Sequence, residues 1–528
     1  MSPLLILALF LPLQNKAPEK CSLSGTVVDS ATGEPLSKVE LRLQPLDVQA
    51  THVAVTTSDP HGRFAMVDLD AASYFLTGKR NGYLEMSFGA RRLGSDGSVV
   101  RLEPGESLND LKLKLVPSAV IAGTVRDSDG DPLEGAHVIL ARFTYLYGAR
   151  RLEGYDSTDT DDRGEYRFHG LEAGKYYIGV QKENPGRPQV DHSASASPSE
   201  TSVPTLYPGV TDVALAAPVE VSAGRNLTGI DIRQLRSRVF RVGGRVLNAP
   251  GVRRQTVVLH EQKNAAMRAY DLRTSTKDAA GNFDFRGVPP GSYEVTVEAE
   301  ALRGRVPVEV GASDVEGVRV ALAPGAEIKL RVISEGSDKP NLTGLDFLLT
   351  ANGRSGFGSS PFESDRLTVR NVPPDHYALR LSGSSLRKSY VKSARTGEAD
   401  VLADGLSLTG PGTIGIEIVI ASDGGAIEGV VRDENQQPVS GATILLAPDR
   451  RTRADLFQSV TSDQNGRYEF AGIAPGHYKL FAWEDVEPEV WNDPDFLKDF
   501  EKQGQATAME PGARVTANLH LATRPDVQ

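Results

Sequence analysis

Few residues in this sequence stand at spacings that could do chemistry. The segment His169-Gly170-Leu171-Glu172 has the H-x-x-E spacing that offers a histidine and a carboxylate to a zinc ion. The equivalent positions of two similar segments, RGVP at 286–289 and AGIA at 471–474, carry neither residue type. We therefore interpret the segment as a structural corner, because the context that would confirm a metal site is missing.

Two acidic segments resemble cation-binding loops. DSDGD at 127–131 begins like a calcium loop, but Val138 stands where the bidentate glutamate would be expected. The matching segments elsewhere, DSATGEP and DENQQP, are ordinary turn sequences. DTDDRGE at 159–165 receives the same interpretation, so the sequence predicts no metal site.

Motifs of the common hydrolases are missing from the sequence. It contains neither an H-E-x-x-H helix motif nor a G-x-S-x-G nucleophile turn. Its single cysteine, Cys21, can form no internal disulfide and no cysteine-based metal cluster. We expect no catalytic residues, no cofactor and no enzymatic activity.

Composition bounds the class of protein. A chain of 528 residues is too long for one hydrophobic core. Its 52 glycines and 32 prolines favour many turns between short strands. The net charge of -11 is spread along the chain, which argues against nucleic acid or an anionic membrane as the main partner.

The sequence repeats itself. TSDQNGRYEFAGIAPGHYKLFAW at 461–483 has near copies that begin at Thr57, Thr160 and Thr276. An upstream companion, EGVVRDENQQPVSGATILLA at Glu428, recurs at Ser24 and Ala122 and in degenerate form at Gly243 and Lys329. The period of about 100 residues predicts five tandem immunoglobulin-sized units. The expected division is 1–20 signal peptide and leader, 21–117 repeat 1, 118–237 repeat 2, 238–325 repeat 3, 326–423 degenerate repeat 4 and 424–528 repeat 5.

One repeat shows the expected local structure. In repeat 5, ATILLA at 442–447 alternates as a strand with one buried face. In the segment SDQNGRYEF, Asp463 can bond the backbone ahead of it and Gly466 can supply a positive φ, which predicts a hairpin. Short strands with frequent turns predict an all-β fold of antiparallel sandwiches.

These residues resemble the carboxypeptidase regulatory-like domain. Repeat 2 carries its pattern at Gly123, Val125, Gly164, Tyr166 and Tyr176, and repeats 1 and 5 match nearly as well. The resemblance implies a prealbumin-like or carbohydrate-binding-like sandwich in a bacterial extracytoplasmic protein of several repeats. In that family the domain accompanies peptidases, receptors and adhesins without carrying their chemistry.

Two aromatic groups are candidate binding residues. Strict alternation after Val138 places Phe143, Tyr145 and Tyr147 on an outer face, where they would suit a sugar ring or a protein partner. The alternatives are a bulge that swaps the register, or cover from a neighbouring domain. Trp483 and Trp491 precede a helix predicted near 494–503, which either packs on its own sandwich or docks a partner.

The N-terminal segment predicts the cellular location of the protein. The apolar run from Leu4 to Leu13 has the length of a signal-peptide core, and no later stretch is long and apolar enough to span a membrane. The Ser- and Pro-rich stretch at 182–209 is expected to be a long loop. Together these features predict a periplasmic or secreted, non-catalytic scaffold that binds protein or glycan at the cell envelope. The alternatives are a carbohydrate-binding protein, or an accessory part of a carboxypeptidase-like system.

Overall fold

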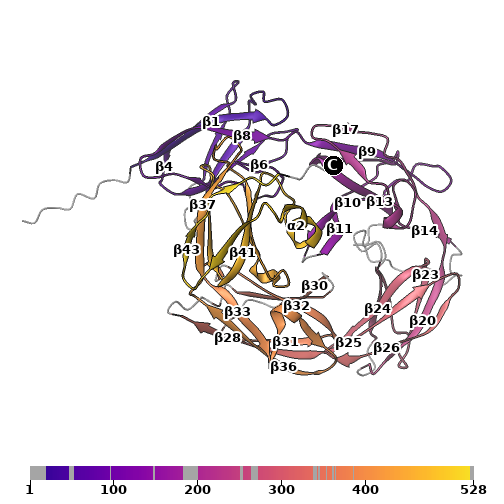
Figure 1. The fold of residues 1–528 in the computed structure, drawn as a ribbon. Coiled ribbons are helices and arrows are strands. Elements are labelled where there is room, and N and C mark those ends of the chain that lie inside the picture. The colour runs from indigo at the N-terminus through magenta and orange to yellow at the C-terminus, as the bar shows by residue number, and fades with distance from the viewer. Residues whose placement is uncertain are drawn as a thin grey trace, which may run out of the picture. The chain divides into compact units, whose positions relative to one another are not determined.

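The computed structural model describes residues 19–46, 53–95, 97–146, 149–181, 200–249, 254–262, 271–336, 342, 345–351, 354–358, 362, 364–383 and 386–523. The chain divides into two compact units, Met1–Val116 and Pro117–Gln528. Strands dominate both units, and the predicted all-β tandem array of sandwiches is confirmed (Figure 1). The predicted signal peptide lies outside the described residues, apart from Glu19 and Lys20.

The first unit is one sandwich, repeat 1. One sheet has the order β4-β1-β8, and the other has β3-β2-β5-β6 with β7 paired to β5. Strand β2 alternates exposed and buried residues along its length, as a strand with one buried face should. The strands are β1 (Cys21–Asp29), β2 (Glu40–Pro45), β3 (Ala54–Thr57), β4 (Arg63–Leu69), β5 (Ser73–Lys79), β6 (Met86–Ser87), β7 (Val100–Arg101) and β8 (Ser107–Leu115).

The second unit begins with repeats 2 and 3. Repeat 2 contains β9 (Ala119–Arg126), β10 (His137–Leu146), β11 (Ala149–Asp159), β12 (Glu165–Leu171), β13 (Gly174–Gln181), β14 (Glu200–Ser202), β15 (Thr205–Leu206), η1 (Val213–Leu215), β16 (Val219–Val221), β17 (Asn226–Leu227), β18 (Ile232–Arg233) and β19 (Arg236–Arg238). Repeat 3 contains β20 (Phe240–Leu247), β21 (Thr256–Glu261), β22 (Asp271–Ser275), β23 (Asn282–Val288), β24 (Gly291–Ala299), β25 (Leu302–Val310), β26 (Val315–Ala321) and β27 (Ala323–Pro324). Of the predicted loop at 182–209, residues 182–199 lie outside the described part, and β14 and β15 follow them.

Repeats 4 and 5 complete the unit. Repeat 4 contains β28 (Ala326–Glu335), β29 (Asp346–Ala351), β30 (Arg354–Gly358), β31 (Arg366–Val372), β32 (Asp375–Ser382), β33 (Tyr390–Thr396), β34 (Ala399–Asp400), α1 (Val401–Asp404), β35 (Leu406–Leu408) and β36 (Gly412–Ala421). Repeat 5 contains β37 (Gly425–Arg432), β38 (Thr443–Pro448), η5 (Ala454–Leu456), β39 (Gln458–Thr461), β40 (Arg467–Ile473), β41 (Gly476–Trp483), η6 (Val490–Asn492), α2 (Pro494–Phe500), β42 (Gln505–Met509), β43 (Arg514–Thr516) and β44 (Leu519–His520). No helix in the described part of the chain is long and apolar enough to cross a membrane.

Every repeat contains parallel strand pairing, which the prediction of antiparallel sandwiches did not include. The first strand of the repeat pairs antiparallel with its fourth strand and parallel with the closing segment, as in β1 with β4 and β8. The same arrangement joins β9 to β17 and β18, β20 to β26, β28 to β36 and β37 to β43 and β44. The closing segment therefore completes the sheet around a central first strand.

The recurring turn is a corner between the two sheets, and its prediction as a hairpin is wrong. In repeat 5, β39 pairs with β38 in one sheet, whereas β40 pairs with β37 in the other. The turn itself is tight, because the Asp463 N–H bonds the Arg467 carbonyl and the Gly466 N–H bonds the Asp463 carbonyl. Strands then leave the turn toward opposite layers of the sandwich.

A hydrophobic core fills each repeat. Five principal clusters of buried side chains follow one another along the described residues, within 21–115, 119–232, 240–322, 326–420 and 427–519. These clusters agree with five sandwiches, while the limits of the domains stay a prediction.

Candidate functional site

The recurring polar residues of the corner bond to backbone. In repeat 5 the fully buried Ser462 hydroxyl accepts from the Ala442 N–H at 3.0 Å and donates to the Val439 carbonyl at 2.7 Å. Ser58 and Thr160 make the same pair of bonds in repeats 1 and 2, and Thr276 accepts the equivalent N–H in repeat 3. This hydroxyl ties the corner to the loop between the first two strands.

The aspartates of these turns also bond to the backbone. Asp463 Oδ1 accepts from the Asn465 and Arg467 N–H groups, both at 2.9 Å. In the predicted calcium-like segment, Asp127 Oδ1 accepts from the N–H groups of Asp129, Gly130 and Asp131. The bonds from Asp131 and Asp129 hold the pKa of Asp127 below its usual value. A carboxylate that accepts three backbone N–H bonds serves a turn.

The H-x-x-E segment forms no site. His169 is exposed, whereas Glu172 is buried and accepts from Arg142 Nη1 at 2.8 Å. Among the described residues no group of three His, Cys, Asp or Glu side chains could hold a metal ion.

Phe143 and Tyr145 lie on the outer face of β10. The β10–β11 ladder does contain a bulge, but the extra residue, Tyr155, is on β11, so β10 keeps its alternation. Phe143 packs edge-on against Tyr177 with ring centroids 5.2 Å apart, and the Arg150 guanidinium lies 4.1 Å from the Phe143 ring centre. The third predicted aromatic, Tyr147, lies outside the described residues.

Tyr145 has a partner far along the chain. Its hydroxyl donates to Asp493 Oδ2 at 3.0 Å, and its ring packs against the aromatic cluster of repeat 5. Burial and this hydrogen bond raise the pKa of Tyr145. The structure therefore brings one of the repeat 2 candidates to the segment that holds the two tryptophan candidates.

Trp483 and Trp491 lie inside that cluster. Trp483 stacks on Phe481 with centroids 5.5 Å apart and meets Phe500 of α2 edge-on. The two indoles are 3% and 8% exposed. Helix α2 is capped by Asp493, whose Oδ1 accepts from the Asp495 N–H. The predicted helix exists and packs on its own sandwich, so both indoles face the protein in this structure.

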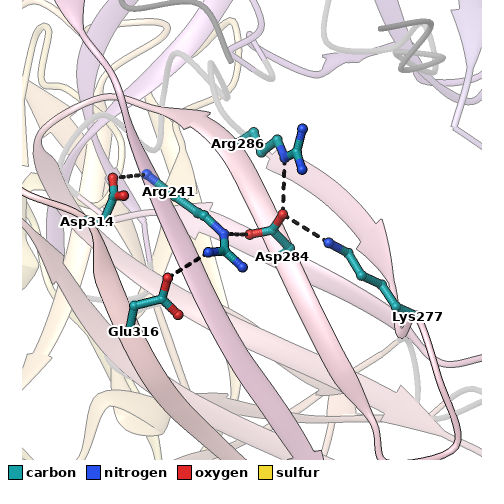
Figure 2. A network of polar contacts seen from close by, with 6 residues as sticks. All are labelled: Arg241, Lys277, Asp284, Arg286, Asp314 and Glu316. Atoms are coloured by element: carbon teal, nitrogen blue, oxygen red, sulfur yellow. Dashed lines mark hydrogen bonds and ion pairs between the residues drawn. The ribbon is translucent and has the colours of Figure 1, made fainter. Parts of the chain in front are cut away.

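Sequence reasoning missed a charged network on the outer face of repeat 3. Asp284 lies between Phe283 and Phe285 on β23, with its side chain 2% exposed. It accepts hydrogen bonds from Arg241 Nε, Lys277 Nζ at 3.0 Å and Arg286 Nε at 3.1 Å (Figure 2). Burial alone would raise the pKa of Asp284, but these three bonds outweigh it and lower the pKa. The FDF pattern predicts an outward Asp284, yet only the register between β20 and β23 shows that Arg241 reaches it.

Two further carboxylates contact Arg241 in this network. Arg241 Nη1 also donates to Glu316 Oε1 at 2.9 Å, and its backbone N–H donates to Asp314 Oδ1 at 2.8 Å. The charges of three cations and three carboxylates therefore cancel. We interpret the network as a brace between β20, β23 and β26, because its charges compensate one another.

A comparison with models of known families finds one match, in two regions of the chain. The model of the carboxypeptidase regulatory-like domain matches residues 120–203 and 426–486. No curated protein sequence matches the chain.

Solved structures give weaker matches. The Bacillus anthracis TIE protein is 13% identical over 57% of this chain and 51% of its own length, with a TM-score of 0.17. This chain thus spans about half of that protein. A streptococcal ancillary pilin is 11% identical over 58% of this chain and 100% of its own, with a TM-score of 0.21. The minor pilin GBS52 of Streptococcus agalactiae is 14% identical over 41% and 95%, with a TM-score of 0.23.

The two matched regions lie in repeats 2 and 5, where the sequence pattern is among the clearest. The resemblance to the carboxypeptidase regulatory-like domain is thus confirmed for residues 120–203 and 426–486.

Proposed function

We propose that this protein is a non-catalytic scaffold of the cell envelope, built from sandwich domains that bind protein or glycan. The observation that carries the proposal is the use of the recurring polar side chains. Ser462, Asp463 and Tyr478 all bond to the backbone of their own repeat, and so do their counterparts in repeats 1 and 2. Residues that recur for reasons of folding leave recognition to the segments that differ between repeats.

An extracytoplasmic location forms part of the proposal. It is supported by the apolar run at Leu4–Leu13, which has the length of a signal-peptide core, and by the regulatory-like domain match. Fractionation of cells that express the full chain with a C-terminal tag tests the location. Recovery in the periplasm or medium is expected, and retention of all the protein in the cytoplasm would contradict it.

The absence of catalysis is tested separately. Purified full-length chain should hydrolyse none of a panel of peptides and esters, with and without added zinc. Turnover that disappears in the His169→Ala variant would overturn the proposal, because that histidine is the exposed member of the H-x-x-E segment.

Carbohydrate binding is the second candidate function. It is favoured by the outer-face group of Phe143, Tyr177 and Arg150, since aromatic rings stack on sugars and guanidinium groups bond their hydroxyls. A glycan array with the parent chain and the Phe143→Ser variant tests it. A glycan bound by both proteins equally would exclude this face, and one bound by the parent alone would support it.

A further inference from the structure

Repeat 2 has a longer hairpin than its counterparts. Strands β10 and β11 contain 10 and 11 residues, whereas β2 and β3 contain 6 and 4, and β38 and β39 also contain 6 and 4. Four extra residues extend a strand by about 13 Å. The end of this hairpin, residues 142–146 and 149–151, is called the docking arm below.

Repeat 5 has a helical insertion after its fifth strand. Between β41 and β42 it places η6 and α2, within residues 484–501. This helical insertion contains eight acidic residues and one basic residue, Lys498. The docking arm has the opposite character, because its charged residues are Arg142, Arg150 and Arg151. The docking arm and the helical insertion are therefore complementary in charge.

The structure places these two segments in contact. The Tyr145 hydroxyl donates to Asp493 Oδ2 at 3.0 Å, across 348 positions of sequence. The Tyr145 ring packs against the cluster that contains Trp483, Trp491 and Phe500, and β10 touches η6. Glu487 of the insertion and Arg150 of the arm both lie close enough to Tyr145 to act on its hydroxyl electrostatically.

Asp493 accepts two hydrogen bonds at this contact. Its Oδ1 caps α2 by accepting from the Asp495 N–H at 3.0 Å, while its Oδ2 accepts from Tyr145. The residue that starts the helix is therefore the residue that receives the arm. We propose that the docking arm of repeat 2 binds the helical insertion of repeat 5 in the same chain, with the Tyr145–Asp493 hydrogen bond at its centre.

The first experiment maps the contact in the full chain. A photoreactive benzoylphenylalanine replaces Tyr145, and equal amounts of isotopically light and heavy chain are mixed before illumination. Cross-linked peptides should join position 145 to residues 484–501, always with the same isotope on both sides. The control places the same group at Arg273, an exposed position on the corresponding hairpin of repeat 3, where no cross-link to 484–501 is expected.

Two results would overturn the proposal. Cross-links from position 145 that avoid residues 484–501 would show that the arm lies elsewhere. Cross-links that pair light with heavy peptides would show that the arm docks on a second copy and not on its own chain.

A second experiment uses the two tryptophans, because the chain has no others and both lie in this cluster. Arg150→Glu places a negative charge against the acidic insertion, so tryptophan emission should shift to the red and hydrogen exchange in 484–501 should accelerate. Arg163→Glu makes the same charge change at an exposed turn of repeat 2 and should alter neither. Equal behaviour of the two variants would contradict the proposal.

The central hydrogen bond is tested by a double-mutant cycle. Tyr145→Phe removes the hydroxyl, and Asp493→Asn removes the charge while asparagine keeps the helix cap. Each single variant should raise hydrogen exchange of the insertion about two- to tenfold. The double variant should exceed neither single variant by much, because each single variant removes or weakens the same charge-assisted bond, and fully additive effects would refute the coupling.

Discussion

Repeats 4 and 5 build the same sandwich with different residues at its centre. In repeat 5, Gly429 of β37 faces Tyr468 of β40, and a Cβ on Gly429 would lie 1.7 Å from the Ala517 carbonyl oxygen and 3.0 Å from the Tyr468 ring. In repeat 4 the facing pair is Leu330 and Leu367. Repeat 4 thus has two facing leucines where repeat 5 has a glycine beneath an aromatic ring.

The ladders beside these pairs differ accordingly. Strand β28 pairs with β36 without interruption from Ala326 to Glu335. Beside Gly429 the ladder of β37 is broken between β43 and β44, and the Val430 N–H bonds the Asn518 side chain at 3.1 Å. The recurring glycine therefore belongs to a close approach of the closing segment, since the repeat with a regular ladder does without it.

The side chain at the sheet-crossing corner also differs between repeats 4 and 5. The Ser462 N–H bonds the Ala442 carbonyl, and the Phe362 N–H of repeat 4 bonds the Leu345 carbonyl at the equivalent place. Ser462 satisfies two backbone groups through its hydroxyl, whereas Phe362 buries its ring in the core with 1% exposure. A polar side chain in repeat 5 and an apolar side chain in repeat 4 therefore stabilise the same corner, which supports a structural role for the repeated motif.

The largest expected effect comes from Gly429→Ala. The added methyl group collides with the Ala517 carbonyl, so the closing segment must move, and we expect a loss of about 3 kcal/mol in the stability of repeat 5. Denaturant unfolding followed by tryptophan emission measures it, because both tryptophans belong to this repeat. Gly415→Ala in β36 is the control, since its Cβ would meet nothing within 4 Å, and hydrogen exchange of repeat 4 should barely change.

Ser462→Ala should have the next largest effect. It leaves the Ala442 N–H and the Val439 carbonyl without a partner in a buried place, at a cost of about 2 kcal/mol. Ser462→Thr is the matched control, because Thr160 and Thr276 occupy this position in repeats 2 and 3. If alanine and threonine were tolerated equally in the same tryptophan-monitored unfolding, the hydroxyl would have no part in the corner.

The sequence predicts this architecture well where local rules decide it. The alternation in ATILLA, the turn role of Asp463 and Gly466, and the Asp493-capped helix follow from residue type and spacing. The parallel closing segment and the sheet-crossing corner could not be predicted, because they depend on which strands pair between segments that are far apart in the sequence.

The candidate sites show the same limit. Alternation correctly places Phe143 and Tyr145 on the outer face of β10, but nothing near Tyr145 in sequence indicates Asp493 as its partner. The rarity of tryptophan in the chain makes both tryptophans candidates, but their burial depends on how α2 folds back over β41. Contacts between distant segments are set by tertiary packing, which local patterns do not encode.

Asp284→Asn tests how much the charged network on the outer face of repeat 3 stabilises that repeat. The three cations are about half exposed, so we expect a loss of only about 1 to 2 kcal/mol at pH 7. The pKa of Asp284 is lower in the folded chain than the unfolded value of about 3.9, so the carboxylate stabilises the fold above about pH 4. That contribution is lost as the pH falls through the folded pKa.

Hydrogen exchange of β20 and β23 measures this effect at pH 7 and below pH 4. The difference between parent and Asp284→Asn should be present at the higher pH and shrink at the lower one. Glu316→Gln changes a more exposed partner of Arg241 and should leave exchange nearly unaltered at both. A difference that grows on acidification would contradict the lowered pKa.

The smallest expected effect concerns a tyrosine hydrogen bond that repeats 4 and 5 share. The Tyr377 hydroxyl donates to the Pro373 carbonyl at 3.0 Å, and the Tyr478 hydroxyl donates to the Ala474 carbonyl at 2.8 Å, each four residues upstream. Burial raises the pKa of both tyrosines to about 12, so both keep the donated proton at neutral pH. Tyr377→Phe and Tyr478→Phe should each cost about 1 kcal/mol, because each leaves one carbonyl unpaired. Hydrogen exchange of β32 and β41 compares them, and a loss confined to repeat 5 would show that repeat 4 holds its corner by packing alone.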